Sequence, residues 1–239
     1  MAMKRVVLKL SGELFKPSST DGKQECLDVP LIDAIITDIK TVQKTHLVNI
    51  VIGGGNFFRG LKEGKALGLR PVTADTIGML ATVMNGIMLR ELFVNRGVPC
   101  VLLNAYAIPG VVHAVDPIAI EKAQEAGEVI IFSGGTGNPF CSTDTAAVLR
   151  ALQVGADTVW KATKVDYVYQ EDPMINPQAL PLKQLTYAQA LAQNLAVMDS
   201  TAIALAQEHD ITLRVFSLFK PQALLHISRD PDFGSTIIK

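Results

Sequence analysis

RVVLKLSG, residues 5–12, is a short run of mostly apolar residues that ends at Ser11 and Gly12. The same order recurs in LVNIVIGGG, residues 47–55, and in VIIFSGGTG, residues 129–137. Strands that are buried on both faces of a parallel sheet are apolar at nearly every position. The three stretches therefore predict parallel strands whose carboxyl ends carry glycine loops.

Outward from these stretches, short apolar runs alternate with longer amphipathic segments along the whole chain. The predicted strands are 5–10, 47–52, 100–103, 129–132, 158–161 and 213–216. The predicted helices are 29–44, 74–96, 116–126, 143–154, 186–193 and 200–208. This alternation predicts an α/β fold with a mainly parallel sheet covered on both sides. Two strand-like pieces within 161–169 predict a hairpin, and 16–23 and 170–181 are predicted loops.

The composition is that of one globular domain of 239 residues, 49% of them apolar, with 22 Lys and Arg against 23 Asp and Glu. The net charge of −1 provides no positive field, so we expect neither nucleic acid nor a membrane surface as a partner. Cys26, Cys100 and Cys141 form no C-x-x-C pair, which favours a reducing cytoplasm. We expect no signal peptide, and the longest weakly polar stretch that we identify, 98–112, is too short to span a bilayer.

The three glycine clusters, at 11–12, 53–55 and 134–137, are the main functional clue. Ligands of open α/β sheets bind beyond the carboxyl ends of the strands, where glycine lets backbone N–H groups approach an anion. Neither a Walker motif nor a dinucleotide fingerprint is present, since Phe140 stands where the latter needs glycine. Each cluster alone is explained by a tight turn, but three together favour one polyphosphate site.

Two cationic side chains lie beside these clusters. Lys9 interrupts an apolar strand two residues before the first loop, where it could neutralise a transferring phosphoryl group or simply reach solvent. Arg59 follows the triple glycine and could bind two phosphate oxygens, although a surface arginine is the alternative.

Two carboxylates stand at the starts of predicted helices. Helix capping explains Asp75 best. Asp144 could also be part of a cap, but the donor-rich loop 135–140 directly before it favours a functional role. The four histidines lack metal-ligand spacing, and cations, amides and hydroxyls suit phosphoryl transfer.

Five motifs together resemble the bacterial uridylate kinases of the amino acid kinase superfamily. The motifs are KLSGE (9–13), GGGNFFRG (53–60), GMLATVMN (78–85), GTGNPFCSTD (135–144) and KATKVDYVYQEDP (161–173). The similarity runs in order from about residue 4 to residue 237. KLSGE points only to the superfamily, whereas GTGNPF followed by T-D and the KATKVD segment points to the uridylate branch.

The resemblance implies an amino acid kinase-like three-layer α/β/α sandwich over residues 1–239, with a UMP-binding part at about 1–150 and an ATP-binding part at about 151–239. It implies transfer of the γ-phosphoryl group of ATP to UMP, giving UDP and ADP, in pyrimidine nucleotide biosynthesis. Mg²⁺ is expected to arrive with ATP, and neither an organic cofactor nor a metal site of the protein's own is expected.

The resemblance also assigns residues. Lys9, Arg59 and Asp144 are the expected catalytic residues. The expected ATP-binding residues are Lys9, Leu10, Ser11, Gly12, Gly55, Arg59, Thr163, Tyr169 and Asp172. The expected UMP-binding residues are Gly54, Asp75, Thr136, Gly137, Asn138, Pro139, Phe140, Cys141, Ser142 and Thr143. Asp199 matches a further family carboxylate, although a helix N-cap explains it equally well.

The chain departs from the family pattern at Tyr167, where glycine is common, and at Cys141, Ser142 and the loop 15–27. Because that loop borders the family's GTP site, GTP activation stays open, whereas inhibition by UTP is expected. A homohexamer is expected, with the apolar face of 74–96 as one candidate contact. Two alternatives remain: a kinase acting on a carboxylate or carbamate, and a non-catalytic nucleotide- or oxyanion-binding protein on the same fold.

Overall fold

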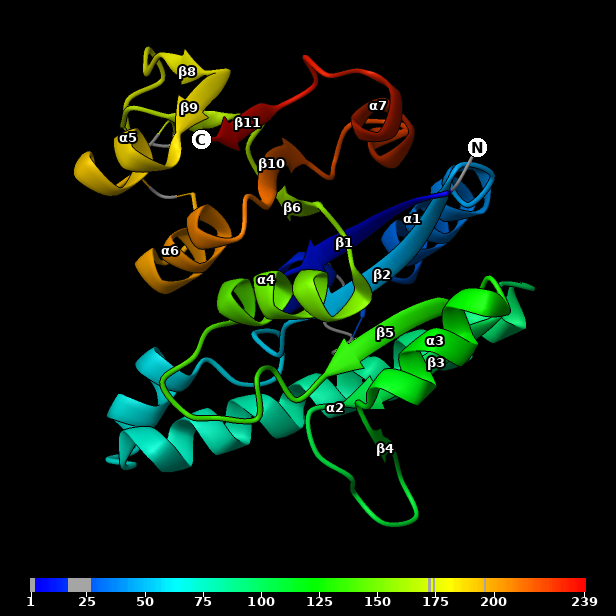
Figure 1. Cartoon of the computed structure of the whole chain (residues 1–239). Helices are drawn as coiled ribbons and strands as arrows, with labels where there is room; N and C mark the ends of the chain where they lie inside the picture. Colours follow the sequence, from blue (N-terminus) through cyan, green and yellow to red (C-terminus); the bar gives the residue numbers. More distant parts are fainter. Residues whose placement is uncertain (1–2, 17–26, 172, 174, 196) are drawn as a thin grey trace.

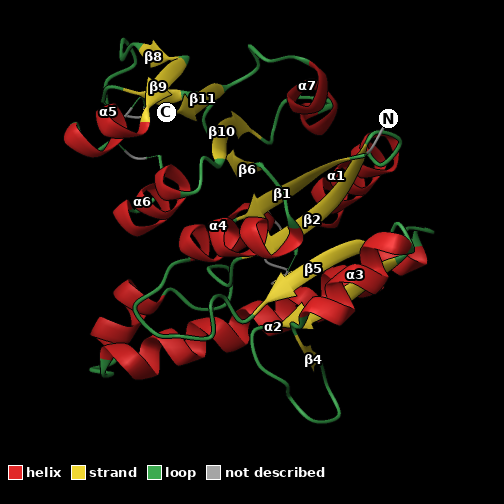
Figure 2. Cartoon of the chain, in the orientation of Figure 1, coloured by secondary structure: helices red, strands yellow, loops and turns green. Residues whose placement is uncertain are grey.

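The structure, a computed structural model, describes residues 3–16, 27–171, 173, 175–195 and 197–239. Cys26, Asp172 and residues 17–23 of the first predicted loop lie outside the described residues. The described part is built on one large sheet with helices on both faces (Figures 1 and 2).

The sheet has nine strands in the order β4-β3-β5-β2-β1-β6-β10-β11-β9. They are β1 (Lys4–Leu10), β2 (His46–Ile52), β3 (Cys100–Asn104), β4 (His113–Ala114), β5 (Val129–Ser133), β6 (Thr158–Thr163), β9 (Gln184–Thr186), β10 (Thr212–Ser217) and β11 (Ser235–Ile238). Every neighbouring pair is parallel except β10 with β11, so the prediction of a mainly parallel sheet is confirmed.

Seven α-helices are described: α1 (Val29–Val42), α2 (Pro71–Asn95), α3 (Pro117–Glu125), α4 (Thr143–Val154), α5 (Tyr187–Ala192), α6 (Ser200–Glu208) and α7 (Ala223–Arg229). Apolar residues of α1, α2 and α7 form one core with one face of the sheet, and those of α3 to α6 form a second core with the other face. Along β1, Leu8 and Leu10 face the first core while Val7 faces the second. The predicted three-layer α/β/α sandwich is thereby confirmed (Figure 2). The boundary near residue 150 between its two parts stays a prediction.

Helix α2 corrects two sequence expectations. It begins at Pro71, three residues before the predicted start, so Asp75 lies in the second turn and is not the N-cap. Proline favours this start because its fixed φ suits the first helical turn, where its missing N–H leaves no bond unmade. By length and composition α2 could also cross a membrane, unlike the shorter stretch 98–112. This is weak evidence for a span, because α2 packs on the sheet and core helices meet the same criteria.

The predicted hairpin within residues 161–169 is wrong. Strand β7 (Val168–Tyr169) pairs antiparallel with β8 (Pro181–Leu182), so the predicted loop 170–181 joins these two strands. The physical reason is that β6 is hydrogen-bonded along both edges, to β1 and to β10, and has no free edge for β7. Helix α7 and strand β11 were not predicted; both are short, at seven and four residues.

Short helical turns follow two of the glycine loops. The first, η1 (Gly12–Phe15), begins directly after β1, and the second, η2 (Gly60–Gly64), precedes α2. The carboxyl ends of β1, β2, β5 and β6 thus open toward the same edge of the sheet, because these strands are parallel.

Gly234→Ala is expected to lower the free energy of unfolding by about 3 kcal/mol, because alanine there meets two obstacles. The φ of Gly234 is +82°, and an added Cβ would lie 2.3 Å from the carbonyl oxygen of Val215. Gly97→Ala is the matched control: its φ is +73°, but an added Cβ meets nothing within 4 Å, so about 1 kcal/mol is expected. Urea denaturation measures both losses, and equal losses would contradict the steric argument.

Candidate active site

Two lysines and one aspartate form a buried charged cluster at the centre of the sheet. Lys9 on β1 and Lys161 on β6 are direct partners in the parallel register, so their side chains leave the same face of the sheet. Asp144, in the first turn of α4, forms an ion pair with each ammonium group: its Oδ1 lies 2.9 Å from Lys9 Nζ, and its Oδ2 accepts a hydrogen bond from Lys161 Nζ at 2.7 Å. Lys161 Nζ also donates to the carbonyl oxygen of Val197.

The charges of this cluster do not cancel. Burial alone would raise the pKa of Asp144, but the ammonium groups of Lys9 and Lys161 outweigh it and hold this pKa below its ordinary value. Burial lowers the pKa of Lys161, and the carboxylate of Asp144 opposes that shift. One carboxylate between two ammonium groups leaves a net charge of +1, which favours an anionic ligand beside it.

The first two glycine loops lie against each other next to this cluster. An added Cβ on Gly12 would lie 2.6 Å from the backbone nitrogen of Gly55 and 2.6 Å from the side-chain oxygen of Asn56. The backbone nitrogen of Gly53 donates to Leu10 at 2.8 Å. Glycine is therefore required at position 12 by close backbone approach.

Arg59 lies at the rim of the same loops, half exposed. Its Nε is 3.1 Å from Glu13 Oε1 and donates to the carbonyl oxygen of Gly55 at 3.4 Å, while its backbone N–H donates to Glu63. The guanidinium is thereby held over the glycine backbone by Glu13, a residue of KLSGE for which we predicted no role.

A cavity of about 500 Å³ opens between these loops, α2 and the loop after β5. Of the predicted residues, those lining it are Ser11, Gly54, Gly55, Arg59, Asp75, Asn138, Cys141, Ser142 and Thr143. The predicted residues around the same loops that do not line it are Lys9, Leu10, Gly12, Thr136, Gly137, Pro139, Phe140 and Asp144. Phe140 instead lines a neighbouring cavity of about 540 Å³ that also contacts Asp75, Cys141 and Ser142.

Asp75 closes this cavity from the side of α2. Its Oδ2 accepts from the backbone N–H of Phe140 at 2.8 Å, which ties α2 to the loop after β5. Phe140 itself has a φ of 64° and its side chain points outward, 74% exposed. The helix-cap explanation of Asp75 is replaced by a contact between two distant segments.

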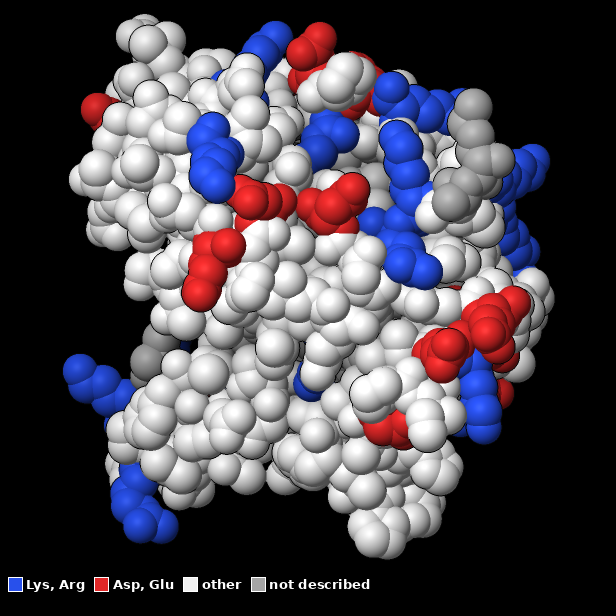
Figure 3. All heavy atoms as spheres, viewed as in Figure 1, with Lys and Arg blue, Asp and Glu red and all other residues white. Residues whose placement is uncertain are grey.

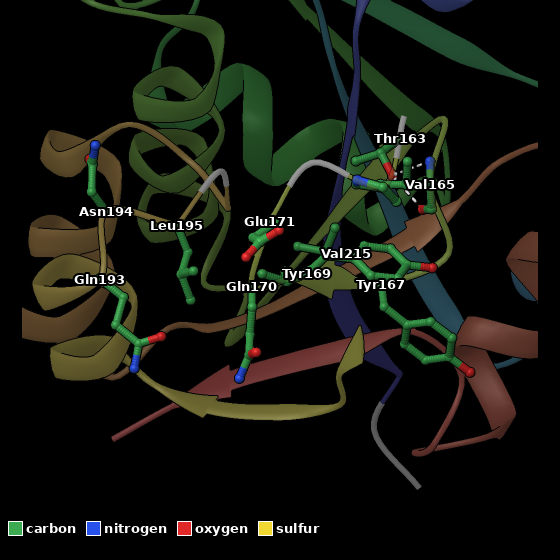
Figure 4. A pocket seen from close by; sticks show the side chains of 12 residues that line it. Thr163, Val165, Tyr167, Tyr169, Gln170, Glu171, Gln193, Asn194, Leu195 and Val215 are labelled. Atoms are coloured by element: carbon green, nitrogen blue, oxygen red, sulfur yellow. Dashed lines mark hydrogen bonds between the residues drawn. The ribbon is translucent and has the colours of Figure 1, made fainter. Parts of the chain in front are cut away.

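A second cavity, of about 330 Å³, lies beyond the end of β6 and is shown in Figure 4. The predicted residues Thr163 and Tyr169 both line it, together with Tyr167 and the segment 193–195. Thr163 follows Lys161 by two residues on the same strand, and its hydroxyl donates to the carbonyl oxygen of Val165 at 2.7 Å. The charged cluster and this cavity thus share one strand.

Comparison with known proteins identifies the fold that carries this site. Residues 4–217 match the model of the amino acid kinase family. This chain belongs to that family. It is 44% identical over 225 residues to a protein named uridylate kinase from Pseudomonas aeruginosa strain PAO1, covering 94% of this chain and 90% of the relative. It is 41% identical over 235 residues to a protein named uridylate kinase from Bradyrhizobium sp. strain ORS 278, covering 98% of this chain and 97% of the relative.

Solved structures give the same family. The crystal structure of UMP kinase from Ureaplasma parvum has a TM-score of 0.92 and 35% identity, and the similarity covers all of both chains. A uridylate kinase from Archaeoglobus fulgidus has a TM-score of 0.72 and 26% identity, covering 98% of this chain and all of the other.

Within this amino acid kinase fold, Asp199 has two structural tasks. It is the N-cap of α6, accepting from the backbone N–H of Ala202 at 3.0 Å, as the capping interpretation predicts. It also accepts from the hydroxyl of Thr145 at 3.0 Å and from that of Ser142, so it holds the first turn of α4 against α6.

Sequence reasoning missed Lys161 as a site residue, although KATKVD was quoted for the resemblance. Like Lys9, Lys161 is a lysine near the end of an apolar strand. The predicted strand ended at Lys161, however, and a lysine at the end of a strand can reach solvent without any functional role. Only the register, which places Lys161 directly beside Lys9, shows that the two side chains share a carboxylate.

Asp144→Asn is expected to lower the free energy of unfolding at pH 7 by about 3 kcal/mol, because it leaves two buried ammonium groups without their counterion. The lowered pKa of Asp144 means that its stabilising effect is present above the unfolded-state pKa and is lost as pH falls through the folded-state pKa. The difference from wild type should therefore shrink as the pH falls below about 4.

Urea denaturation at pH 7 and at lower pH measures this effect. Asp166→Asn is the matched control, because its ion pair with Lys220 is about 40% exposed and should contribute less than about 1 kcal/mol. A loss for Asp144→Asn no larger than that for Asp166→Asn would contradict the assignment.

Proposed function

We propose that this protein is an ATP:UMP phosphotransferase, which transfers the γ-phosphoryl group of ATP to UMP to give UDP and ADP. The observation that carries this proposal is the cluster of Lys9, Asp144 and Lys161 next to glycine loops, in a chain 41–44% identical over nearly its whole length to proteins named uridylate kinase. The donor and acceptor each have a candidate cavity, of about 330 and 500 Å³.

The chemistry fits the residues. A nucleoside monophosphate is largely a dianion at pH 7, since its second pKa is near 6, so its phosphate oxygen attacks without a general base. Transfer then depends on positioning and on stabilising charge on the transferring group. In our proposal Lys9 and Lys161 supply that stabilisation, and Asp144 orients both ammonium groups, because its two oxygens are already engaged.

The phosphate-binding roles follow from position. Ser11, Gly12, Gly55 and Arg59 would hold the phosphates of the nucleotides, since backbone amides and a guanidinium meet there. Asp75, Asn138 and Thr143 line the acceptor cavity, and Thr163 and Tyr169 line the donor cavity. These assignments remain proposals for mutagenesis.

We propose that Mg²⁺ arrives with ATP. Among the described residues no group of three or more His, Cys, Asp or Glu side chains could hold a metal ion. Mg²⁺ is commonly bound through substrate phosphates and one or two carboxylates, so the nucleotide phosphates can supply most of its ligands. When bound, the ion neutralises charge that develops on the β- and γ-phosphoryl oxygens.

A non-catalytic nucleotide- or oxyanion-binding protein is the alternative, and it is not favoured. Binding alone does not need two lysines buried against a shared carboxylate, an arrangement whose desolvation costs several kcal/mol per ion. A kinase for a carboxylate or carbamate is likewise less consistent with the named relatives.

A set of acceptors tests the reaction and its charges. ADP formation with ATP and Mg²⁺ is expected with UMP and not without an acceptor, and CMP and dUMP in the same run measure how far the protein discriminates among nucleotides. Lys9→Met and Lys161→Met should each lower kcat at least about 100-fold, because each removes a cation that stabilises the transition state. Full turnover by either folded variant would overturn its role, and UMP binding without any wild-type turnover would favour the non-catalytic alternative.

We further propose a homo-oligomer, with a hexamer as the expected form. Along α2, Ala81 is buried in the core, whereas Leu80, Met84 and Ile87 are 43–51% exposed. Ile87 and Met88 also line an apolar groove of about 810 Å³ between α2 and the start of α1. An exposed apolar stripe beside an apolar groove suits contact with a second copy of the chain.

Met84→Glu should therefore shift the protein to smaller assemblies, because a charge placed in an apolar contact is costly. Light scattering after size-exclusion chromatography measures the molar mass. Ile118→Glu, at an exposed apolar residue of α3, should leave the mass unchanged. A monomeric wild-type protein would contradict the proposal.

Three expectations complete this proposal. UTP is expected to inhibit by occupying the acceptor cavity, and GTP activation is left open, since most of the loop 15–27 lies outside the described residues. A cytoplasmic location and a role in pyrimidine nucleotide biosynthesis remain predictions. On the face seen in Figure 3, Lys and Arg side chains gather toward the upper right, and Asp and Glu side chains lie beside and below them.

A further inference from the structure

Arg150 is a buried cation that the proposed reaction does not use. It lies on α4, is 2% exposed, and among the described residues forms no ion pair with a carboxylate. Burial lowers the pKa of its guanidinium, with no neighbouring charge opposing the shift. Burying a cation without a counterion costs folding free energy, so the contacts that Arg150 makes point to a role for it.

Those contacts lead to the loop after β5. Arg150 Nη2 donates to the carbonyl oxygen of Gly135 at 2.9 Å, and Nη1 donates to Gln153 one turn further along the helix. The guanidinium carbon lies 5.5 Å from the centre of the Phe132 ring, a cation–π contact with β5. Its Nε is buried and has no hydrogen-bond partner in the described part of the chain.

The loop that Arg150 reaches has little stiffness of its own. Gly134, Gly135 and Gly137 all have positive φ, and glycine restricts the backbone least. Within the loop one backbone–backbone bond is made, from the N–H of Gly137 to Gly134 at 3.0 Å, and the Thr136 hydroxyl bonds to the N–H and the carbonyl oxygen of Asn138. These bonds do not reach the backbone of Gly135, whose position therefore depends on contacts from outside the loop.

Three outside contacts hold it. The N–H of Gly134 donates to the hydroxyl of Thr82 at 2.6 Å, and the N–H of Phe140 donates to Asp75 at 2.8 Å; both acceptors belong to α2. The bond from Arg150 is the anchor on the opposite side, from α4. Gly135 and Asn138 of this loop line the acceptor cavity, and Asp144, six residues before Arg150, carries the charged cluster.

We propose that Arg150 is a positioning residue for the acceptor: it fixes the Gly135 carbonyl and thereby the shape of the loop 134–140 against which the acceptor nucleotide binds. This inference rests on the proposed kinase function. Arg150 does not touch the reacting groups, and it acts through the loop, so its loss should affect acceptor binding selectively.

The test compares Arg150→Met, which keeps the apolar stem and removes every donor, with Arg214→Met. Arg214 is a matched control, because it too is largely buried, has an unpartnered Nε and donates to backbone carbonyls, those of Ile227, Asp230, Pro231 and Phe233. It lies on β10, and three strands separate β10 from β5 in the sheet.

Arg150→Met should raise KM for UMP at least about tenfold, which corresponds to the loss of one charge-assisted hydrogen bond. KM for ATP should change less than about twofold. Arg214→Met should lower Tm and leave KM for UMP unchanged. Arg150→Lys, which keeps the charge and a single donor, should lie between wild type and Arg150→Met. Equal changes in both KM values, or none, would overturn the inference.

Hydrogen exchange provides a second readout that does not depend on activity. The amides of Gly137 and Phe140 should exchange about tenfold faster in Arg150→Met than in wild type, whereas Arg214→Met should leave them unchanged. If Arg150→Met does not fold, Arg150→Gln decides by the same two measurements, since its shorter amide does not span the distance to Gly135. A wild-type protein without UMP turnover would contradict the proposed function. Unchanged exchange in the loop of Arg150→Met would separately contradict the positioning role of Arg150.

Discussion

The shared carboxylate of Asp144 is the interaction on which the rest of the site depends. Two buried ammonium groups side by side on neighbouring strands would repel each other, and only an anion between them makes that arrangement stable. The parallel register of β1 and β6 brings the lysines together, and the first turn of α4 supplies the carboxylate. A central position in the sheet leaves each of the three side chains only 11–14% exposed and places their net positive charge next to the glycine loops.

Helix α4 links this cluster to the acceptor side. Its N-cap, Ser142, donates to Asp199, and its first turn carries Asp144. Two turns further along, Arg150 reaches back to the loop that precedes the helix. The same rigid element thus sets the position of the charged cluster and the shape of the acceptor cavity, so the two cannot move independently without breaking hydrogen bonds.

The alternation of apolar runs and amphipathic segments was sufficient to predict the layers and most strands, because burial on both faces leaves a strong local pattern. Contacts between distant segments leave no such pattern. Asp75 was predicted to be a helix cap, but the helix starts at Pro71, so Asp75 lies inside it. The predicted hairpin at 161–169 does not form because both edges of β6 are already paired. The position of Lys161 beside Lys9 follows from the register of two strands that are far apart in the chain. Arg150 bonds to the carbonyl of Gly135, fifteen residues earlier. Local sequence encodes neither contact.

The order of the strands in the sheet also has a consequence for synthesis of the chain. Strand β1 comes long before its partner β6, which begins at Thr158, and the other edge of β6 pairs with β10, which begins at Thr212. During translation Lys9 on β1 is therefore made long before β6, the neighbouring strand that carries Lys161. The two ammonium groups and the carboxylate that they share therefore come together only after the chain has been made as far as β6.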